Sequence, residues 1–164
     1  MKRILDIILV LGLLILDQVS EALAVANLKE AAAIPIIKNV FELQYLENHG
    51  AAFGSMQGKQ IFLQGFTIIV LILLLFIYIK MPADKRYNPL KLTTILLFAG
   101  AIGNMIDRVI QGYVVDFFYF KLIDFPIFNV ADCYVTVAAF LLVFLILFVY
   151  KEEDLDFISK KKEE

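Results

Sequence analysis

Several charged and amide side chains interrupt or border the long apolar stretches of this chain, and they offer the most chemistry. They are Asp17, Asn104, Asp107, Arg108, Asp116, Asn129 and Asp132. Ionisable groups are costly to bury in a membrane, so each is a candidate functional residue. Two carboxyl groups that share one proton can hold a water molecule between them, one as base and the other as acid. These residue types therefore indicate water activation by an aspartate pair.

Other kinds of catalysis have little support in the sequence. The chain has one histidine, His49, and one cysteine, Cys133, which excludes metal motifs built from several of either residue. Ser20 and Ser55 have no plausible general base other than His49. A net charge of −2 offers no basic surface for nucleic acids.

Four apolar stretches must position the polar residues. The 164-residue chain is 61% hydrophobic and has a mean hydropathy of +0.81, whereas soluble domains are roughly 45–50% apolar. A helix needs roughly 20 apolar residues to cross ~30 Å of hydrocarbon. The stretches that qualify are residues 4–23, 61–79, 90–110 and 131–150. We predict an α-helical membrane protein with four transmembrane helices, forming a single membrane domain over residues 1–164.

The first apolar stretch has a second interpretation, as a cleaved secretory signal peptide. A basic start at residues 1–3 precedes the apolar run, and residues 22–24 form a small-x-small triplet typical of a cleavage site. Asp6 and Asp17 are poor residues for the core of such a peptide, so the sequence favours a retained helix.

The distribution of lysine and arginine predicts the orientation. With the N-terminus inside, the inner segments hold Lys2, Arg3, Lys80, Lys85, Arg86, Lys91, Lys151, Lys160, Lys161 and Lys162, and the outer segments hold Lys29, Lys38, Lys59 and Lys121. Because cytoplasmic loops carry an excess of these residues, we expect both termini to be cytoplasmic.

Two segments, residues 25–60 and 112–128, then lie on the outer side. The first is too long for a plain turn, and apolar and polar residues alternate in it from Phe41 to Tyr45, as in a half-buried strand. The second is rich in aromatic and β-branched residues and is expected to be extended. Together they predict a small extracytoplasmic platform that contains β-structure. The charged tail at 151–164 is expected to be a solvated helix end or disordered.

Helix geometry brings the polar residues to one depth. At 1.5 Å per residue, Asp17 lies about 24 Å along its span, and residues 104–108 lie about 20–26 Å past Lys91. Asp132 begins its own span at the outer side, and Asp116 lies in the outer segment before it. Separate segments therefore bring carboxylates to the outer edge of the bilayer.

Spacing within the third span groups its polar residues. Gly100, Asn104, Asp107 and Arg108 fall at i, i+4, i+7 and i+8, on one helix face. Gly100 and Gly103 are small enough to let a neighbouring helix approach closely. Asn129 and Asp132 are three residues apart and share a face if the last helix has begun there.

Four sequence blocks resemble the lipoprotein signal peptidases, the bacterial membrane aspartic peptidases also called signal peptidase II. The blocks are Asp17-Gln18-Val19-Ser20, Asn48-His49-Gly50-Ala51-Ala52-Phe53-Gly54, Gly103-Asn104-Met105-Ile106-Asp107-Arg108 with Val114-Val115-Asp116-Phe117, and Phe128-Asn129-Val130-Ala131-Asp132. Any one block is weak, but their order and spacing within four spans are highly specific. The resemblance covers nearly the whole chain.

The resemblance implies that Asp116 and Asp132 are the catalytic pair. The supporting residues would be Asp17, Asn48, Gly50, Asn104, Asp107, Arg108 and Asn129, with Asp107 as a structural partner. The family removes the signal peptide from prolipoproteins that carry a diacylglyceryl group, cutting just before the lipidated cysteine. It needs no metal or other cofactor, and its partners are the lipidated substrate and the membrane. The implied location is the bacterial cytoplasmic membrane, with the active site at the outer face.

The sequence departs from the family pattern at Glu21, where the first block usually continues with lysine. The exchange replaces a cation by an anion near the site. It would lower activity, change how the lipid headgroup is held, or be offset by Lys29 or Lys59. A catalytically impaired member that binds lipidated peptides is therefore an alternative function. A lesser departure is Ala99, where the family more often has glycine.

Two further interpretations stay open from the residues alone. The carboxylates would also suit a small ion or solute transporter, although such proteins often show internal repeats and midplane sites, and neither is visible here. Asp132 would also suit the first turn of a helix, with Asn129 as its N-cap. Asp116 alone would be an ordinary solvated loop carboxylate.

Overall fold

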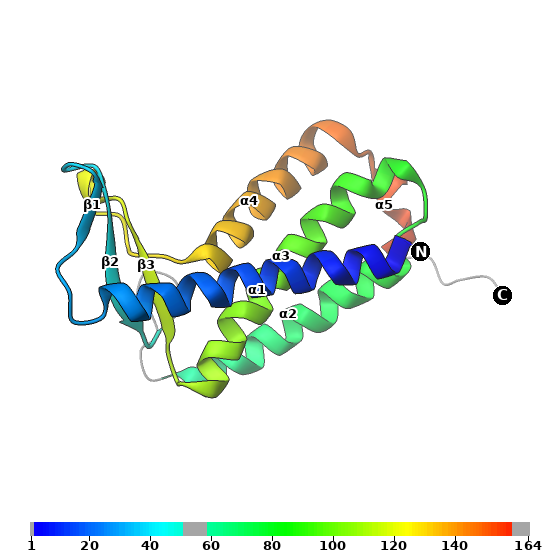
Figure 1. Ribbon diagram of the computed structural model, residues 1–164. Coiled ribbons are helices and arrows are strands. Elements are labelled where there is room, and N and C mark those ends of the chain that lie inside the picture. The colour runs from blue at the N-terminus through cyan, green and yellow to red at the C-terminus, as the bar shows by residue number, and fades with distance from the viewer. Residues whose placement is uncertain (1, 51–58, 159–164) are drawn as a thin grey trace.

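The computed structural model describes residues 2–50 and 59–158. Its long helices are α1 (Lys2–Leu28), α2 (Gln60–Lys80), α3 (Asn88–Ile110) and α4 (Val130–Phe144), and a π-helical turn, Leu145–Val149, continues α4. All four are long and apolar enough to cross a membrane. They run lengthwise together, with the strands at one end and the N-terminus at the other (Figure 1). The predicted fold class is confirmed.

Helix α3 is the centre of the bundle and contacts α1, α2 and α4. A Cβ atom at Gly100 would overlap the carbonyl oxygen of Ala131 on α4, and one at Gly103 would overlap the carboxylate of Asp17 on α1. The predicted close approach at these glycines is therefore confirmed. Helix α2 buries none of its side chains although it is almost wholly apolar, as expected where lipid supplies the apolar surroundings.

A three-stranded antiparallel sheet covers one end of the bundle. Its strands are β1 (Ile34–Ile37), β2 (Phe41–Asn48) and β3 (Val114–Tyr119), in the order β1-β2-β3. Helix α1 extends past the predicted span to Leu28, where its last turns pack on Val115 and Phe117 of β3. One detail differs from the alternation expected in β2: Glu42 is buried, because it forms an ion pair with Lys121 at 3.1 Å.

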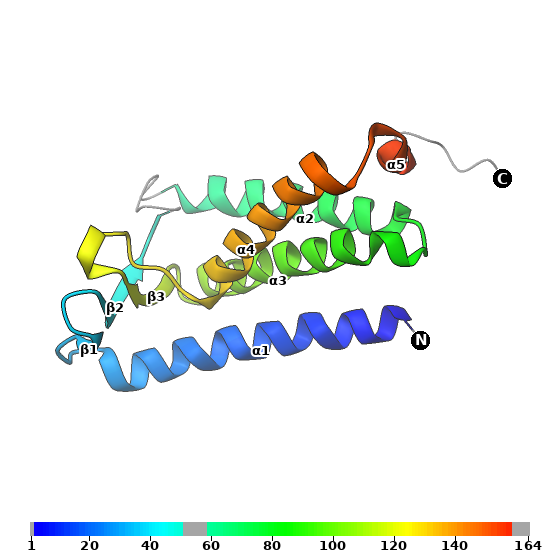
Figure 2. The same ribbon diagram turned by 90° about the horizontal axis from the view of Figure 1, so that it is seen from above.

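The opposite end is closed by the segment after α4. It forms α5 (Glu152–Leu155) and a 3-10 turn (Asp156–Ile158), which lie near a second turn, η2 (Lys85–Tyr87), that precedes α3. Figure 2 shows α5 against this end of the bundle. Tyr87 donates a hydrogen bond to the carbonyl of Asp154, and its ring meets Phe157 edge-on. The described part of this segment is therefore a short separate helix that packs on the bundle, rather than the solvated helix end or disordered tail that the sequence suggested.

Candidate active site

Polar side chains from α1, α3, β3 and α4 meet where the helices join the sheet. Asp116 comes from β3, and Asp132 comes from the first turn of α4. Asp116 is 1% exposed, and the charge of Asp132 acts on it directly. The two aspartates that the resemblance implied as a pair are therefore electrostatic neighbours.

The sheet holds Asp116. Asn48 of β2 lies opposite Val114, so Asp116 is its diagonal neighbour two residues along β3, within reach of a long polar side chain. Asn48 Nδ2 donates to Asp116 Oδ2 at 2.8 Å. The register slips by one residue between the Leu43–Phe118 pair and the Leu46–Asp116 pair, and such bulges re-aim side chains.

Burial and the nearby charge of Asp132 raise the pKa of Asp116 to about 7 from its ordinary value of 3.8. Its second oxygen, Oδ1, is buried with no hydrogen-bond partner among the described residues. The carboxyl group therefore keeps a proton up to neutral pH.

The start of α4 holds Asp132. Asn129 is the N-cap: its Oδ1 accepts from the Asp132 N–H at 2.9 Å, and the Asn129 N–H points back to Asp132 Oδ2 at 3.4 Å. This reciprocal capping box satisfies two amides of the first turn. The N-cap interpretation of Asn129 is confirmed, and it fixes the backbone that carries Asp132.

Helix α3 completes the network. Asn104 Nδ2 donates to Asp132 Oδ1 at 2.9 Å, while Asn104 Oδ1 accepts from Asn129 Nδ2 at 3.0 Å. The Arg108 guanidinium donates to the carbonyl oxygens of Asn104 at 3.1 Å and Gly50 at 3.0 Å. Its positive charge acts on both Asp116 and Asp132. The structure therefore ties this part of α3 to both the sheet and α4.

Two further aspartates lie around this network. Asp17 is fully buried, and its Oδ1 accepts from the Ala131 N–H at 2.8 Å, which ties α1 to the start of α4. Asp107 is 4% exposed and accepts from Gln18 Nε2 at 3.1 Å. All seven supporting residues named from the sequence thus lie at this end of the bundle.

Two site residues were not predicted as such. Gln18 holds Asp107, and Glu21 is buried and accepts from Asn129 Nδ2 at 3.1 Å. Their signal was their place one and four residues after Asp17 on a mostly apolar helix. The suggestion that Lys29 offsets Glu21 is wrong, because Lys29 pairs with Glu47 at 3.1 Å.

Some sequence-based candidates have other surroundings or lie outside the described residues. His49 packs its ring 5.3 Å from that of Tyr113 and lies 3.9 Å from the carboxylate of Glu47. Within residues 2–50 and 59–158, no three His, Cys, Asp or Glu side chains are grouped to hold a metal ion. The end of the second block, residues 51–54, and Ser55 lie outside the described residues.

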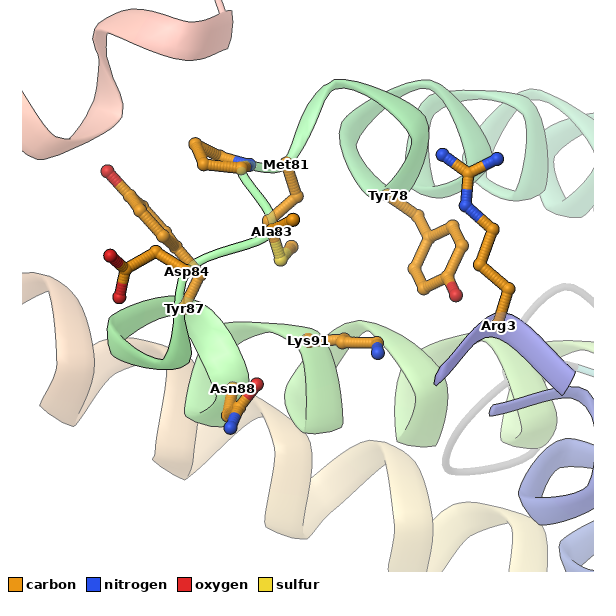
Figure 3. A pocket seen from close by; sticks show the side chains of 9 residues that line it. Arg3, Tyr78, Met81, Ala83, Asp84, Tyr87, Asn88 and Lys91 are labelled. Atoms are coloured by element: carbon orange, nitrogen blue, oxygen red, sulfur yellow. The ribbon is translucent and has the colours of Figure 1, made fainter. Parts of the chain in front are cut away.

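A pocket of about 290 Å³ lies at the other end of the bundle. Figure 3 shows Arg3, Tyr78 and Lys91 around it. Lys91 forms an ion pair with Asp6 at 2.5 Å. None of the network residues lines this pocket, so it is separate from the candidate active site.

Comparison with known proteins agrees with the network. A family model described as signal peptidase (SPase) II matches residues 9–148. The chain is 44% identical over 143 residues to the lipoprotein signal peptidase of Caldanaerobacter subterraneus, covering 87% of this chain and 95% of that protein. It is 43% identical over 152 residues to that of Clostridium tetani, covering 90% and 92%.

Two solved structures have the same fold. Both are described as bacterial membrane enzymes. One is 35% identical, with a TM-score of 0.78 over 97% of this chain and 93% of the other, and the second is 36% identical, with a TM-score of 0.76 over 88% and 94%. The chain therefore belongs to the signal peptidase II family, and it is a multi-pass membrane protein and an aspartic peptidase of the lipoprotein signal peptidase type.

Proposed function

We propose that Asp116 and Asp132 activate the water that cleaves diacylglyceryl-modified prolipoproteins just before the lipidated cysteine. The main support for this proposal is that the carboxyl groups of Asp116 and Asp132, which come from separate elements, lie near each other in different surroundings. Asp116 is almost fully buried in the sheet, whereas Asp132 stands at a helix N-terminus with two donors aimed at it.

These surroundings support different roles for the two aspartates. Hydrogen bonds from Asn104 and from the Asn129 N–H favour the ionised form of Asp132, and so does the helix N-terminus. Asp116 retains its proton because its pKa is raised to about 7. Asp132 is then the general base, and Asp116 is the general acid.

Hydrolysis follows from this arrangement. Asp132 takes a proton from the water as the water oxygen attacks the carbonyl carbon before the lipidated cysteine, and Asp116 donates its proton to the carbonyl oxygen. As the C–N bond breaks, Asp132 gives the proton it took from water to the cysteine nitrogen, and a hydroxyl of the tetrahedral intermediate returns a proton to Asp116. The signal peptide then leaves with a new carboxyl end. The Asn48 and Asn104 amides hold the two aspartates at the positions this transfer requires.

The substrate would approach from the lipid. Its signal helix enters beside the spans while the diacylglyceryl chains stay in the bilayer, and the sheet supports the peptide near the scissile bond. The site faces the outer side, and both termini are cytoplasmic. Segment 25–60 acts as the platform or lid. Spin labels on β1 would test the lid, because equal mobility with and without substrate would contradict it.

Glu21 supports one alternative, a member that binds lipidated peptides without cutting them. The experiment that separates the two functions uses purified protein in detergent with a diacylglyceryl-modified prolipoprotein and its unlipidated form. Mass spectrometry identifies the new end. Cleavage before the lipidated cysteine only, absent in Asp116→Asn, supports the peptidase. Binding of the lipidated peptide without cleavage supports the alternative.

A further inference from the structure

Glu21 is a buried acidic residue beside the site that the mechanism above does not use. It lies on α1 and is 4% exposed. Its Oε1 accepts from Asn129 Nδ2 at 3.1 Å, and Asn129 in turn caps the helix that carries Asp132. Glu21 is thus one side chain removed from the proposed general base.

The ionisable groups that act on Glu21 are acidic. Asp17 on α1, Asp107 on α3 and Asp116 on β3 all act on its carboxyl group. In the described part of the chain, no lysine or arginine forms a salt bridge with it. An ionised carboxylate that is buried without a cation among like charges is strongly disfavoured relative to the neutral acid.

Asp107 offers an acceptor for the proton of that neutral acid. Its Oδ1 is taken by Gln18, but its Oδ2 is buried and meets no donor among residues 2–50 and 59–158. The Glu21 carboxyl group lies within hydrogen-bonding reach of Asp107. Because ionised carboxylates can only accept, a hydrogen bond between the two requires one proton.

We infer that Glu21 and Asp107 share one proton, with Glu21 as donor, and that this pair fixes the amide of Asn129 and through it Asp132. Glu21 Oε1 accepts a hydrogen bond from Asn129 Nδ2. This contact orients the Asn129 amide so that its oxygen accepts from the Asp132 N–H. The shared proton removes one of the two negative charges that Glu21 and Asp107 would otherwise bring together. Glu21 is therefore a positioning residue.

Infrared spectroscopy of the purified protein at neutral pH tests the shared proton. The wild-type-minus-Glu21→Gln difference spectrum should show the carbonyl band of a protonated carboxylic acid, because the variant lacks that acid. The matched control is Glu47→Gln, which removes a glutamate paired with Lys29 and should lose only a carboxylate band. If Glu21→Gln also loses only a carboxylate band, the shared proton is wrong.

Activity tests the positioning role. Glutamine can donate to Asp107 and accept from Asn129, so Glu21→Gln should cleave within about threefold of wild type. Leucine can do neither, so Glu21→Leu should lose about ten- to hundredfold in kcat. Equal losses in both variants would overturn the positioning role. This arm rests on the proposed function, whereas the infrared arm does not, so failure of one is distinguishable from failure of the other.

Discussion

The carboxyl groups of the candidate active site and those at the opposite end of the bundle have opposite surroundings. At the end near the N-terminus, Asp6 pairs with Lys91 at 2.5 Å and Asp154 pairs with Arg86 at 2.6 Å. The Arg86 hydrogen bond lowers the pKa of Asp154. At the sheet end, burial instead raises the pKa of Asp116, and one cation, Arg108, acts on both catalytic candidates.

The difference distinguishes structural charges from reactive ones. A paired carboxylate is held ionised and is a poor acid, whereas an underpaired buried carboxyl group keeps a proton that it can transfer. Neutral amides such as Asn104 and Asn129 fix the positions of the carboxyl groups without supplying the charge that would neutralise them. Neutral support of this kind is what an acid–base pair requires.

The largest expected difference in activity is between two variants that each remove one carboxyl group, one at each end of the bundle. Asp132→Asn should lower the rate of prolipoprotein cleavage by about a thousandfold, because it removes the proposed general base. Asp6→Asn should stay within about threefold, because its partners Lys91 and Tyr78 lie at the other end of the bundle. Initial rates at saturating substrate measure both. Equal losses would erase the distinction between the two ends.

A second test removes the neutral support. Asn129→Ala should lower activity about ten- to hundredfold, because the cap and the Asn104 contact that orient Asp132 are lost. Loss of the cap should also cost about 1 kcal/mol of stability. The control is Asn27→Ala, which removes an exposed amide that bonds only within α1. Wild-type activity in Asn129→Ala would show that Asp132 needs no such support.

Helix approach gives a third test. Gly103→Ala places a methyl group against Asp17, so α1 and α3 must separate, which should destabilise the protein by about 1–3 kcal/mol and lower activity about tenfold. Gly65→Ala on α2 meets open space and should leave both unchanged or slightly raise stability. Thermal unfolding followed by a cleavage assay measures the two. A tolerated Gly103→Ala would show that the close contact does not matter.

The pH dependence should also differ between the ends. The folded protein holds the Asp116 proton up to about pH 7, whereas the unfolded chain releases it near 3.8. The folded state therefore binds more protons in this window, and its stability falls as pH rises through it. Asp154 has the opposite sign and loses its contribution as pH falls below 3.8.

In activity, the same proton should give an alkaline limb in kcat near pH 7. Unfolding temperatures of wild type and Asp116→Asn between pH 4 and 8 check the stability effect, because the wild type should lose more on the way up. A wild-type profile parallel to that of Asp116→Asn would refute the raised pKa of Asp116.

The smallest effect is expected at the surface of the paired end. Asp154→Asn disrupts the two hydrogen bonds from Arg86 but leaves the sheet end untouched. Because exposed ion pairs contribute little, cleavage should stay within about twofold, with a small drop in unfolding temperature. A large loss of cleavage would mean that α5 communicates with the site.

Much of the fold was predictable because membrane spans can be recognised in a sequence by their length and hydropathy. The strand at Phe41 and the close approach at Gly100 followed from alternation and from small side chains. The extension of α1 to Leu28 was not predictable, since its last turns are fixed by packing on β3. The burial of Glu42 also depends on a partner, Lys121, distant in sequence.

The residues of the site were predictable from the sequence, but the hydrogen bonds between them were not. Depth along the helices brought Asp17 and Asp132 to one level, and the family blocks singled out Asp116. No spacing rule indicated that Asn48 would hold Asp116, because that contact depends on the register of two strands distant in sequence. The contact of Glu21 with Asn129 was also not predictable, because the two residues lie far apart in the sequence.

The most direct test of the account measures single-turnover cleavage of a diacylglyceryl-modified prolipoprotein by Asp116→Asn, Asp132→Asn and the double variant. If the two aspartates act as a unit, each single variant should cleave about a thousandfold more slowly than wild type. The double variant should then cleave no more slowly than the slower single variant. A single variant that retains wild-type cleavage, or losses that multiply in the double variant, would contradict joint catalysis by Asp116 and Asp132.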